Sequence, residues 1–213
     1  MTRSYITEDR FIHWINLIRE TNDSRNRYDM LEAFWGSQVK SKSWLIDQIK
    51  EIYKNNPEWE KTGTAYVFGG WHGFAAMLII DHLPNIHTVY SLDKDPKCAL
   101  YGNMLTNNDP RIKFKTYDMT VFSKEFYPDD IALIVNTSTE HLRQRGYDDW
   151  FANIKENTLL AVQGNNYHAV ADHVRFSENL DMFVSQNHID NILYKGELDC
   201  AQFTRYMCIG YKQ

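Results

Sequence analysis

The sequence predicts an α/β fold: a mostly parallel sheet with helices on both faces, preceded by a helical segment. After Gly63, short apolar runs alternate with stretches of helical periodicity, as in strand–helix–strand units. Residues 131–135 are all apolar, which is typical of a parallel strand buried on both faces. Before Gly63, apolar residues recur at helical spacing. We therefore expect residues 1–62 to form an N-terminal helical cap and residues 63–213 to form the α/β domain.

Three helices are expected before Gly63. Thr7 can cap the first, because its hydroxyl can accept a hydrogen bond from a first-turn N–H group. The apolar face of this helix would comprise Phe11, Trp14, Ile15 and Ile18. A polar loop over residues 22–27 would lead to a second helix over residues 28–35. A third helix would begin at Ser41 or Ser43 and end at the Asn-Asn-Pro sequence that follows it.

The α/β domain is expected to contain strands alternating with helices. The strands would cover residues 64–68, 87–92, 112–116, 131–135, 158–163, 192–198 and 203–211. The helices would cover residues 74–83, 96–105, 147–154 and 177–184. Because crossovers between parallel strands are right-handed, ligands of such sheets bind at the carboxyl ends of the strands. The polar residues that follow these strands are therefore the candidate site.

Composition argues against several classes of function. The 213 residues include 23 Lys and Arg against 28 Asp and Glu, a net charge of −5, which disfavours a nucleic-acid partner held through its phosphates. No apolar run approaches the roughly 20 residues of a membrane span. Charges near the N-terminus argue against a signal peptide. The 3 cysteines form no CxxC pair. We expect a cytoplasmic protein with a small-molecule substrate, and its oligomeric state stays open.

Three glycines lie between the first strand of the α/β domain and its helix, in the sequence Gly69-Gly70-Trp71-His72-Gly73. A tight turn needs glycine, and so does a ligand that approaches the backbone closely. The dinucleotide pattern GxGxxG does not fit, because Trp71 and Phe74 occupy its third and sixth positions. An ordinary strand-to-helix turn is the alternative.

Two aspartates follow the next two strands. Asp93 ends the second strand, 20 residues after Gly73, where a carboxylate can accept both hydroxyl groups of a ribose. Asp118 follows the third strand and can accept an adenine amino group, with Met119 against the ring. The alternatives are a helix cap for Asp93, a role that Asp95 fills better, and a solvated loop for Asp118.

A polar loop over residues 136–141 follows the buried fourth strand. Glu140 and His141 in this loop can bind or deprotonate a substrate. In the alternative interpretation, Thr137 or Ser138 caps a helix and Glu140 lies in its first turn.

Other polar groups lie in the cap and after the fifth strand. Residues 163–168 form either one wall of a substrate pocket or a polar turn. Lys42 either reaches a ligand carboxylate or is solvated, and Trp44 lies beside it in sequence. Arg205 is either a pocket charge or a charge that protects an edge strand.

In their order and spacing, these motifs resemble those of the class I (Rossmann-like) S-adenosylmethionine-dependent methyltransferases, over roughly residues 63–213. The resemblance implies a seven-stranded sheet whose last strand is antiparallel, and S-adenosyl-L-methionine as the cofactor. The motif positions that match are Gly69 and Gly73 in the cofactor loop, Asp93 as the ribose-binding acid and Asp118 as the adenine contact. Two departures make the chain an atypical member: Val67 replaces an acidic residue, and Trp71 replaces the central glycine.

The resemblance also implies the residues of the site. The expected cofactor-binding residues are Gly69, Gly70, Trp71, Gly73, Asp93, Lys94, Asp118, Met119, Asn136, Thr137 and Ser138. Trp71 would lie beside the sulfonium of the cofactor, since a cation over an aromatic face is stabilised. The expected catalytic residues are Glu140 and His141. The expected substrate-binding residues are Lys42, Trp44, Asn165 and Tyr167.

Histidines and aromatic residues carry two further expectations. His82 and His87 are five residues apart, as are His168 and His173, and neither pair has the i,i+4 spacing that places two metal ligands on one helix face. No metal site is therefore expected. The chain is rich in rings, with 6 Trp, 13 Tyr and 11 Phe. We expect several of Trp35, Trp44, Trp71 and Tyr167 to line one closed pocket around a sulfonium cation.

Three functions follow from the resemblance. The first is transfer of the methyl group to a small-molecule nucleophile, by in-line displacement at the sulfonium. The second is attack on the aminocarboxypropyl chain, by transfer or by cyclisation, which would release methylthioadenosine. The third is a binding protein that holds the cofactor without consuming it. The motif Asp/Asn-Pro-Pro-Tyr of enzymes that methylate base or amide nitrogens is absent from the fourth loop.

Overall fold

The computed structural model describes residues 5–213, and it contains the predicted sheet. Within these residues, seven strands form one sheet in the order β3-β2-β1-β4-β5-β7-β6. The strands are β1 (Gly63–Phe68), β2 (Ile86–Asp93), β3 (Ile112–Thr116), β4 (Ile131–Asn136), β5 (Leu159–Asn165), β6 (Asn191–Asp199) and β7 (Thr204–Tyr211). Neighbours from β3 to β5 are parallel, while β7 is antiparallel to both β5 and β6. A mostly parallel sheet with an antiparallel last strand is thereby confirmed.

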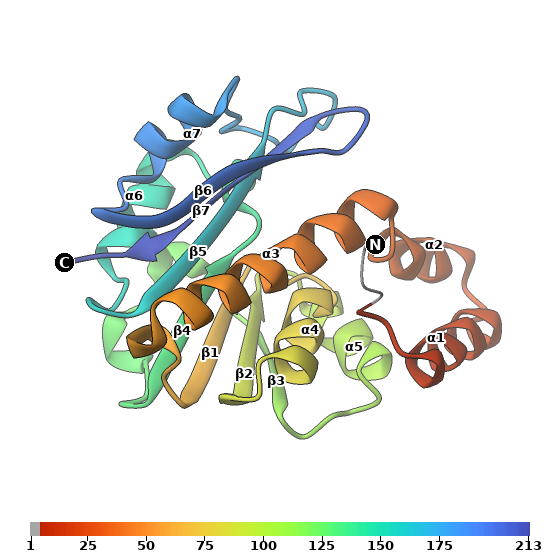
Figure 1. The fold of residues 1–213 in the computed structure, drawn as a ribbon. Coiled ribbons are helices and arrows are strands. Elements are labelled where there is room, and N and C mark those ends of the chain that lie inside the picture. The colour runs from red at the N-terminus through yellow and green to blue at the C-terminus, as the bar shows by residue number, and fades with distance from the viewer. Residues whose placement is uncertain (1–4) are drawn as a thin grey trace.

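Helices cover both faces of this sheet (Figure 1). The helices are α1 (Glu8–Glu20), α2 (Ser24–Glu32), α3 (Gly36–Asn55), α4 (Phe74–His82), α5 (Pro96–Leu105), α6 (Gln144–Ala152) and α7 (Leu180–Asn187). Four short 3-10 helices lie in the connections between these strands and helices: η1 (Pro57–Trp59), η2 (Met119–Val121), η3 (Lys124–Phe126) and η4 (Thr139–His141). α3 and α4 pack on each other and share one apolar cluster with residues of α1 and α5. α6 and α7 contribute to the cluster on the opposite face.

The central strands show why the core has two halves. Alternate residues of a strand point to opposite faces of the sheet. Ala65 and Val67 of β1 join the cluster that includes α3 and α4, while Tyr66 and Phe68 join the cluster that includes α6. Every position of β1 and of β4 is buried. The prediction from the apolar run over residues 131–135, a strand covered on both faces, is therefore confirmed.

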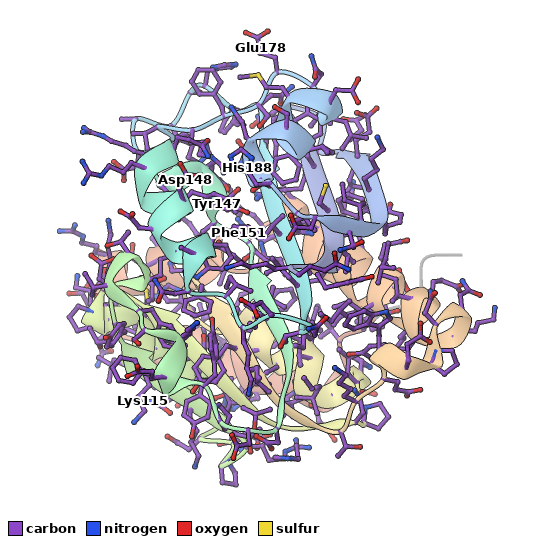
Figure 2. All side chains as sticks on the ribbon, turned by 90° about the vertical axis from the view of Figure 1, so that its left-hand side faces the viewer. Lys115, Tyr147, Asp148, Phe151, Glu178 and His188 are labelled. Atoms are coloured by element: carbon purple, nitrogen blue, oxygen red, sulfur yellow. The ribbon has the colours of Figure 1, made fainter. Side chains whose placement is uncertain are left out.

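α6 and the end of α7 lie together on the second face (Figure 2). The ring of Tyr147 stacks on that of Phe151 one turn later, and its hydroxyl donates a hydrogen bond to the carbonyl of Asn187 (2.8 Å). Asp148 Oδ1 lies 3.8 Å from Nε2 of His188, the residue that ends α7. These contacts fix the chain that leads back to β6.

α1 begins where its sequence predicts but presents a narrower apolar face. Thr7 caps the helix by accepting a hydrogen bond from the N–H of Arg10 (3.3 Å), as expected. Of the predicted face, Trp14 and Ile18 are buried, while Phe11 is 55% and Ile15 is 41% exposed. The predicted face was therefore too wide at Phe11 and Ile15, because α1 is attached to α4 and α5 through Arg10, His13 and Trp14 instead.

α2 begins earlier than predicted, within the segment expected to be a loop. Asp23 caps it by accepting hydrogen bonds from the N–H groups of Arg25 and Asn26 (2.8 and 2.9 Å). The first turn of α2 is polar because it lies largely at the surface. An aspartate cap, which the sequence contains, was the overlooked feature.

α3 also begins before its predicted start. The prediction that Ser41 or Ser43 caps the helix is wrong, because the helix begins at Gly36 and both serines lie inside it. The hydroxyl of Ser41 donates to the carbonyl of Gln38 in the preceding turn (3.2 Å) instead of accepting from a first-turn N–H. A serine hydroxyl inside a helix can bond to a carbonyl of the preceding turn, so a serine in the sequence does not by itself indicate where a helix begins.

The described part of the segment before β1, residues 5–62, shares the core of the sheet. Leu45, Ile46 and Ile49 of α3 are buried in the same cluster as α4 and β1. Trp44 packs beside this cluster. The helical character of this region is as predicted, and its role as a lid over a substrate stays a prediction. Among the residues that the structure describes, no helix is long and apolar enough to cross a membrane.

Candidate functional site

The glycine loop, residues 69–73, forms a tight turn between β1 and α4. Gly69 and Gly73 have positive φ angles of 59° and 79°, and Trp71 between them has a φ of 46°. The N–H of Gly73 donates to the carbonyl of Gly70 (2.9 Å). Because a bulky residue rarely adopts positive φ, Trp71 holds a backbone conformation that the surrounding contacts must enforce.

Packing within the protein requires these glycines. A Cβ on Gly70 would lie 2.1 Å from Oγ of Ser91, and one on Gly73 would lie 2.4 Å from the ring of Phe114. A Cβ on Gly69 would likewise lie 2.6 Å from that of Ser138. Neighbouring side chains therefore give a sufficient reason for all three glycines, beside any close approach of a ligand.

Asp93 ends β2 directly beside the glycine loop. Its Oδ2 accepts a hydrogen bond from the backbone N–H of Trp71 (3.0 Å), and its Oδ1 accepts one from the N–H of Asp95 (3.1 Å). Asp95 itself caps α5, which is the role that the sequence assigned to it. A carboxylate has about four acceptor positions, so Asp93 keeps capacity for further donors. Its neighbour Lys94 is exposed.

Asp118 has a local partner, whereas Met119 contacts the glycine loop. Oδ1 of the exposed Asp118 accepts hydrogen bonds from the N–H and the hydroxyl of Thr120 (2.9 and 2.8 Å). The Cε atom of Met119 lies 3.5 Å from the Cβ position of Gly69. Its sulfur accepts a hydrogen bond from Nδ2 of Asn136 (3.4 Å). The loop after β3 therefore meets the glycine loop through Met119.

The loop after β4 is also tied to the glycine loop. The hydroxyl of Ser138 donates to the carbonyl of Gly69 (3.1 Å), and its N–H donates to Oδ1 of Asn136 (3.0 Å). Ser138 precedes η4 without a side-chain capping bond, so the interpretation of Ser138 as a helix cap is wrong. Thr137, between Asn136 and Ser138 in sequence, is buried.

Glu140 is the centre of a buried polar cluster. Only 3% of the residue is exposed. Its Oε1 accepts hydrogen bonds from Nδ2 of Asn165 (2.6 Å) and from Nη1 of Arg205 (3.1 Å). Arg205 lies on β7, between β5 and β6, so its interpretation as an edge-strand charge is wrong. Oε2 of Glu140 is buried without a hydrogen-bond partner among the described residues.

Lys42 reaches this cluster from α3. Its Nζ donates to Oε1 of Gln38 (2.8 Å), and the residue is buried. Burial, together with the nearby positive charge of Arg205, lowers the pKa of Lys42 to about 7, although the charge of Glu140 acts in the opposite direction. α3 is fixed at this place by Nε2 of Gln163, which donates to the carbonyl of Ser41 (3.0 Å).

His141 and His173 meet at the rim of the same cluster. His141 is exposed, and its ring centroid lies 4.8 Å from that of His173 in an edge-to-face arrangement. His173 belongs to the segment between β5 and α7, far from His141 in sequence. Its Nδ1 lies 2.7 Å from the carbonyl oxygen of Tyr167. No local pattern in the sequence pairs these two residues.

Solved structures share this arrangement of strands and helices, although neither a protein-family model nor a curated protein matches the sequence. One is N-methyltransferase NodS from Bradyrhizobium japonicum WM9 in complex with S-adenosyl-L-homocysteine (TM-score 0.61, 12% identity, 94% of this chain and 99% of that chain). A second is magnesium protoporphyrin IX methyltransferase from Synechocystis PCC 6803 with bound S-adenosylmethionine (TM-score 0.57, 11% identity, 99% and 95%). The CurJ carbon methyltransferase also matches (TM-score 0.64, 12% identity, 93% and 61%).

This chain has the class I methyltransferase fold. The match extends beyond the sheet, since it covers 94% of the chain for NodS. The names of the matched proteins include an N-methyltransferase and a carbon methyltransferase. The methyltransferase fold therefore leaves the acceptor atom open.

Within this methyltransferase fold, the four rings considered for one pocket have separate partners or are exposed. Trp35 is 56% exposed. Nε1 of Trp44 donates to the hydroxyl of Tyr194 on β6 (3.2 Å). Trp71 stacks on His72, and Tyr167 packs on the ring of Phe203. No ring contact joins two of these four side chains, all in the described part of the chain, and a pocket lined by several of them stays a prediction.

His72 is a residue of the glycine loop that the sequence did not single out. It is buried, and its ring stacks on Trp71 and meets the ring of Tyr101 edge to face. Burial lowers the pKa of His72 to about 4. The imidazole is therefore neutral at pH 7 and stabilises the loop through its contacts with the rings of Trp71 and Tyr101.

Proposed function

We propose that this chain binds S-adenosyl-L-methionine across the glycine loop and transfers its methyl group to a small-molecule nucleophile. The observation that carries the proposal is the joining of three strand ends into one edge. Asp93 bonds to the backbone of Trp71, and Ser138 bonds to the backbone of Gly69. The methyltransferase fold supports placing the cofactor at this edge.

The cofactor contacts are assigned by the position of each group along that edge. Asp93 would accept the ribose hydroxyls, and Asp118 with Met119 would hold the adenine. The glycine loop with Asn136, Thr137 and Ser138 would hold the amino-acid end, with Trp71 beside the sulfonium. Lys94, exposed after Asp93, would lie at the outer rim.

The buried cations are suited to a carboxylate. Lys42 and Arg205 face one carboxylate, that of Glu140, so the cluster carries more positive than negative groups when Lys42 is protonated. An additional ligand carboxylate would balance it, and the amino-acid end of the cofactor supplies one. Asn165 orients Glu140, and Tyr167 lies on the adjacent loop with its N–H bonded to Oδ1 of Asn165 (2.8 Å).

The chemistry needs little from the protein besides position. When bound, the cofactor supplies the electrophilic methyl group. The chain's own residues would hold the acceptor in line and exclude water, which favours the displacement by removing its entropic barrier. Glu140 and His141 would face the acceptor. The exposed His141 can take a proton from an acceptor that arrives protonated.

Calorimetry tests the binding site. The Asp93→Asn variant should bind S-adenosylmethionine about 10–100-fold more weakly than wild type, since hydrogen bonds to a charged group contribute about 1.5–3 kcal/mol. Asp95→Asn is the matched control, because asparagine also caps helices and Oδ1 of Asp95 is bonded to the N–H of Lys97 in α5. Equal affinity in Asp93→Asn and wild type would contradict the site.

Mass spectrometry of the products tests the reaction. With a mixture of small-molecule acceptors, S-adenosylhomocysteine should accumulate. Methylthioadenosine would contradict methyl transfer and point to attack on the aminocarboxypropyl chain. Binding without either product, over a broad acceptor mixture, would point to a non-catalytic role.

The location we propose is cytoplasmic, on the ground that Cys98, Cys200 and Cys208 are all free thiols.

A further inference from the structure

Glu140, His141 and His173 bring one carboxylate and two imidazoles together at the rim of the proposed site. Each offers one ligand atom, and these atoms all lie within 4.8 Å of one another. We infer that these three residues bind a divalent transition-metal ion of the zinc type. The inference departs from the expectation of no metal, which rested on spacing within a single helix and did not consider two loops that converge.

The geometry allows an ion after a small adjustment. Two nitrogens bound to one tetrahedral ion, each at about 2.1 Å, lie about 3.4 Å apart. The three ligand atoms must therefore draw closer than they are without an ion. His141 is exposed and His173 is partly exposed, and His173 lies outside helices and strands. Their rings can turn without disturbing the core.

His173 already has the arrangement of a metal ligand. Its Nδ1 lies 2.7 Å from the carbonyl oxygen of Tyr167, and a carbonyl only accepts, so Nδ1 carries the proton. In the neutral ring, Nε2 then holds the free lone pair. A backbone carbonyl that fixes the tautomer in this way is the usual second partner of a metal-binding histidine.

Glu140 supplies an independent observation. Arg205 and Asn165 both bind Oε1, which fixes the carboxylate plane. Oε2 is buried and has no hydrogen-bond partner among the described residues. A buried carboxylate oxygen without a partner is costly. An ion bound to Oε2 would satisfy it.

The class of ion follows from charge. Because Arg205 already neutralises Glu140, electrostatic attraction contributes little, and the two imidazoles must supply most of the affinity. Imidazole favours zinc and its transition-metal neighbours, whereas magnesium and calcium prefer oxygen ligands. With three protein ligands, at least one position of the ion would stay open, as in sites where a metal acts on a substrate.

The consequence for the acceptor rests on the proposed function. An ion at this edge would bind an acceptor through an oxygen atom and polarise it next to the methyl group. His141 would then be a ligand of the ion instead of a base. The metal site itself can be tested without any cofactor, so the two proposals fail separately.

Cobalt titration of the full-length chain, without a histidine tag and stripped by a chelator, tests the site. One equivalent of Co²⁺ should bind and produce visible absorbance, Zn²⁺ should displace it, and Mg²⁺ should not. His141→Gln and His173→Gln should each weaken Co²⁺ binding by about 10–100-fold or more, the range seen when only the outer partners of a metal ligand are changed. His168→Gln is the matched control, since its exposed ring packs on Phe176 and is not one of the three clustered ligands.

Two outcomes would overturn the inference: no bound cobalt in wild type, or affinity that persists in the His141→Gln/His173→Gln double variant. Both substitutions lie at the surface side of the cluster, and circular dichroism confirms that each variant is folded. S-adenosylmethionine affinity is measured on the same samples. Cobalt binding without cofactor binding supports the metal site and contradicts the proposed function. Cofactor binding without cobalt binding contradicts the metal site and supports the proposed function.

Discussion

Single residues in the site are charged where a protein core is usually apolar. Glu140 and Arg205 are each 3% exposed and Lys42 is 7% exposed. Removal of one partner of such a pair leaves the other charge buried and uncompensated, which is far more costly than the pair is favourable. The sequence marked Glu140 as important, but its partner lies 65 residues away on another strand. Pairing of this kind is set by the tertiary fold.

Substitution of Arg205 by methionine should therefore strongly destabilise the protein. We expect Arg205→Met to lower the free energy of unfolding by about 3–5 kcal/mol, measured by urea denaturation. The double variant Glu140→Gln/Arg205→Met should lose clearly less than the sum of the single losses, because it removes both charges. A loss of under about 1 kcal/mol in Arg205→Met would show that the pair is not buried as described.

His72 should make stability depend on pH. Its pKa is about 4 in the folded protein, because burial disfavours the charged ring, against 6.5 ordinarily. As the pH falls, the unfolded chain binds the proton first, so stability is lost from about pH 6.5 down to about pH 4. Between pH 6.5 and pH 5 this loss is about 2 kcal/mol, or 1.5 units at about 1.36 kcal/mol each.

Comparison of variants isolates this effect from that of the carboxylates. His72→Gln should lack this share of the pH dependence in urea denaturation at pH 5 and pH 7. His168→Gln, at an exposed position, should keep the wild-type dependence. Identical pH profiles for His72→Gln and wild type would mean that the His72 ring is solvated or paired.

Among the elements, the turn between β1 and α4 contains glycines that are required for two different reasons. Gly70 has a steric reason alone, because its Cβ would meet Oγ of Ser91 at 2.1 Å. Gly73 has both a steric reason, the ring of Phe114, and a φ of +79°. Gly70→Ala should cost about 1–3 kcal/mol by overpacking. Ser91→Ala should restore much of that stability, since it removes the oxygen that the new Cβ would meet.

Gly73→Ala is the contrasting case. No single truncation should rescue it fully, because alanine remains strained at positive φ even when the ring is removed. Two double-mutant cycles measure this difference by thermal unfolding. The first combines Gly70→Ala with Ser91→Ala, and the second combines Gly73→Ala with Phe114→Ala. Equal rescue in the two cycles would contradict the distinction.

Element boundaries were predictable from the sequence where periodicity and caps agreed. The helix over residues 96–105 and the strand over residues 112–116 were predicted with their observed limits. Pro96 at the first turn and Asp95 before it gave both signs of a helix start. The starts of α2 and α3 were wrong, because Asp23 was overlooked and serine hydroxyls inside α3 resembled caps.

On the scale of the whole molecule, α3 acts as a layer of the fold. Its buried residues join those of α4 over the sheet. We expect a chain of residues 63–213 alone to lack a cooperative unfolding transition, since the apolar face below α3 would be exposed. Circular dichroism during heating and dispersion of amide signals measure this. A cooperatively folded 63–213 fragment would instead show that the first 62 residues are a separable cap.

The composition of the site could be predicted only in part. The carboxyl edge of the sheet follows from the alternation of strands and helices, and so do Asp93, Ser138 and Glu140. The convergence of His173 with His141, and the burial of Lys42, depend on how loops and α3 cross that edge. Local patterns carry no information about contacts between such distant segments, so these residues became visible only in the folded chain.

The antiparallel strand β7 has a consequence for synthesis. It is the last strand of the chain, yet it lies between β5 and β6 and carries the cation opposite Glu140. A nascent chain that stops before residue 204 therefore leaves β5 without its neighbour and Glu140 without its counter-charge. Because domains emerge from the ribosome N-terminus first, the site can be completed only when the final strand has left the exit tunnel. A product truncated there would expose the edge of β5, which is a template for pairing with another chain.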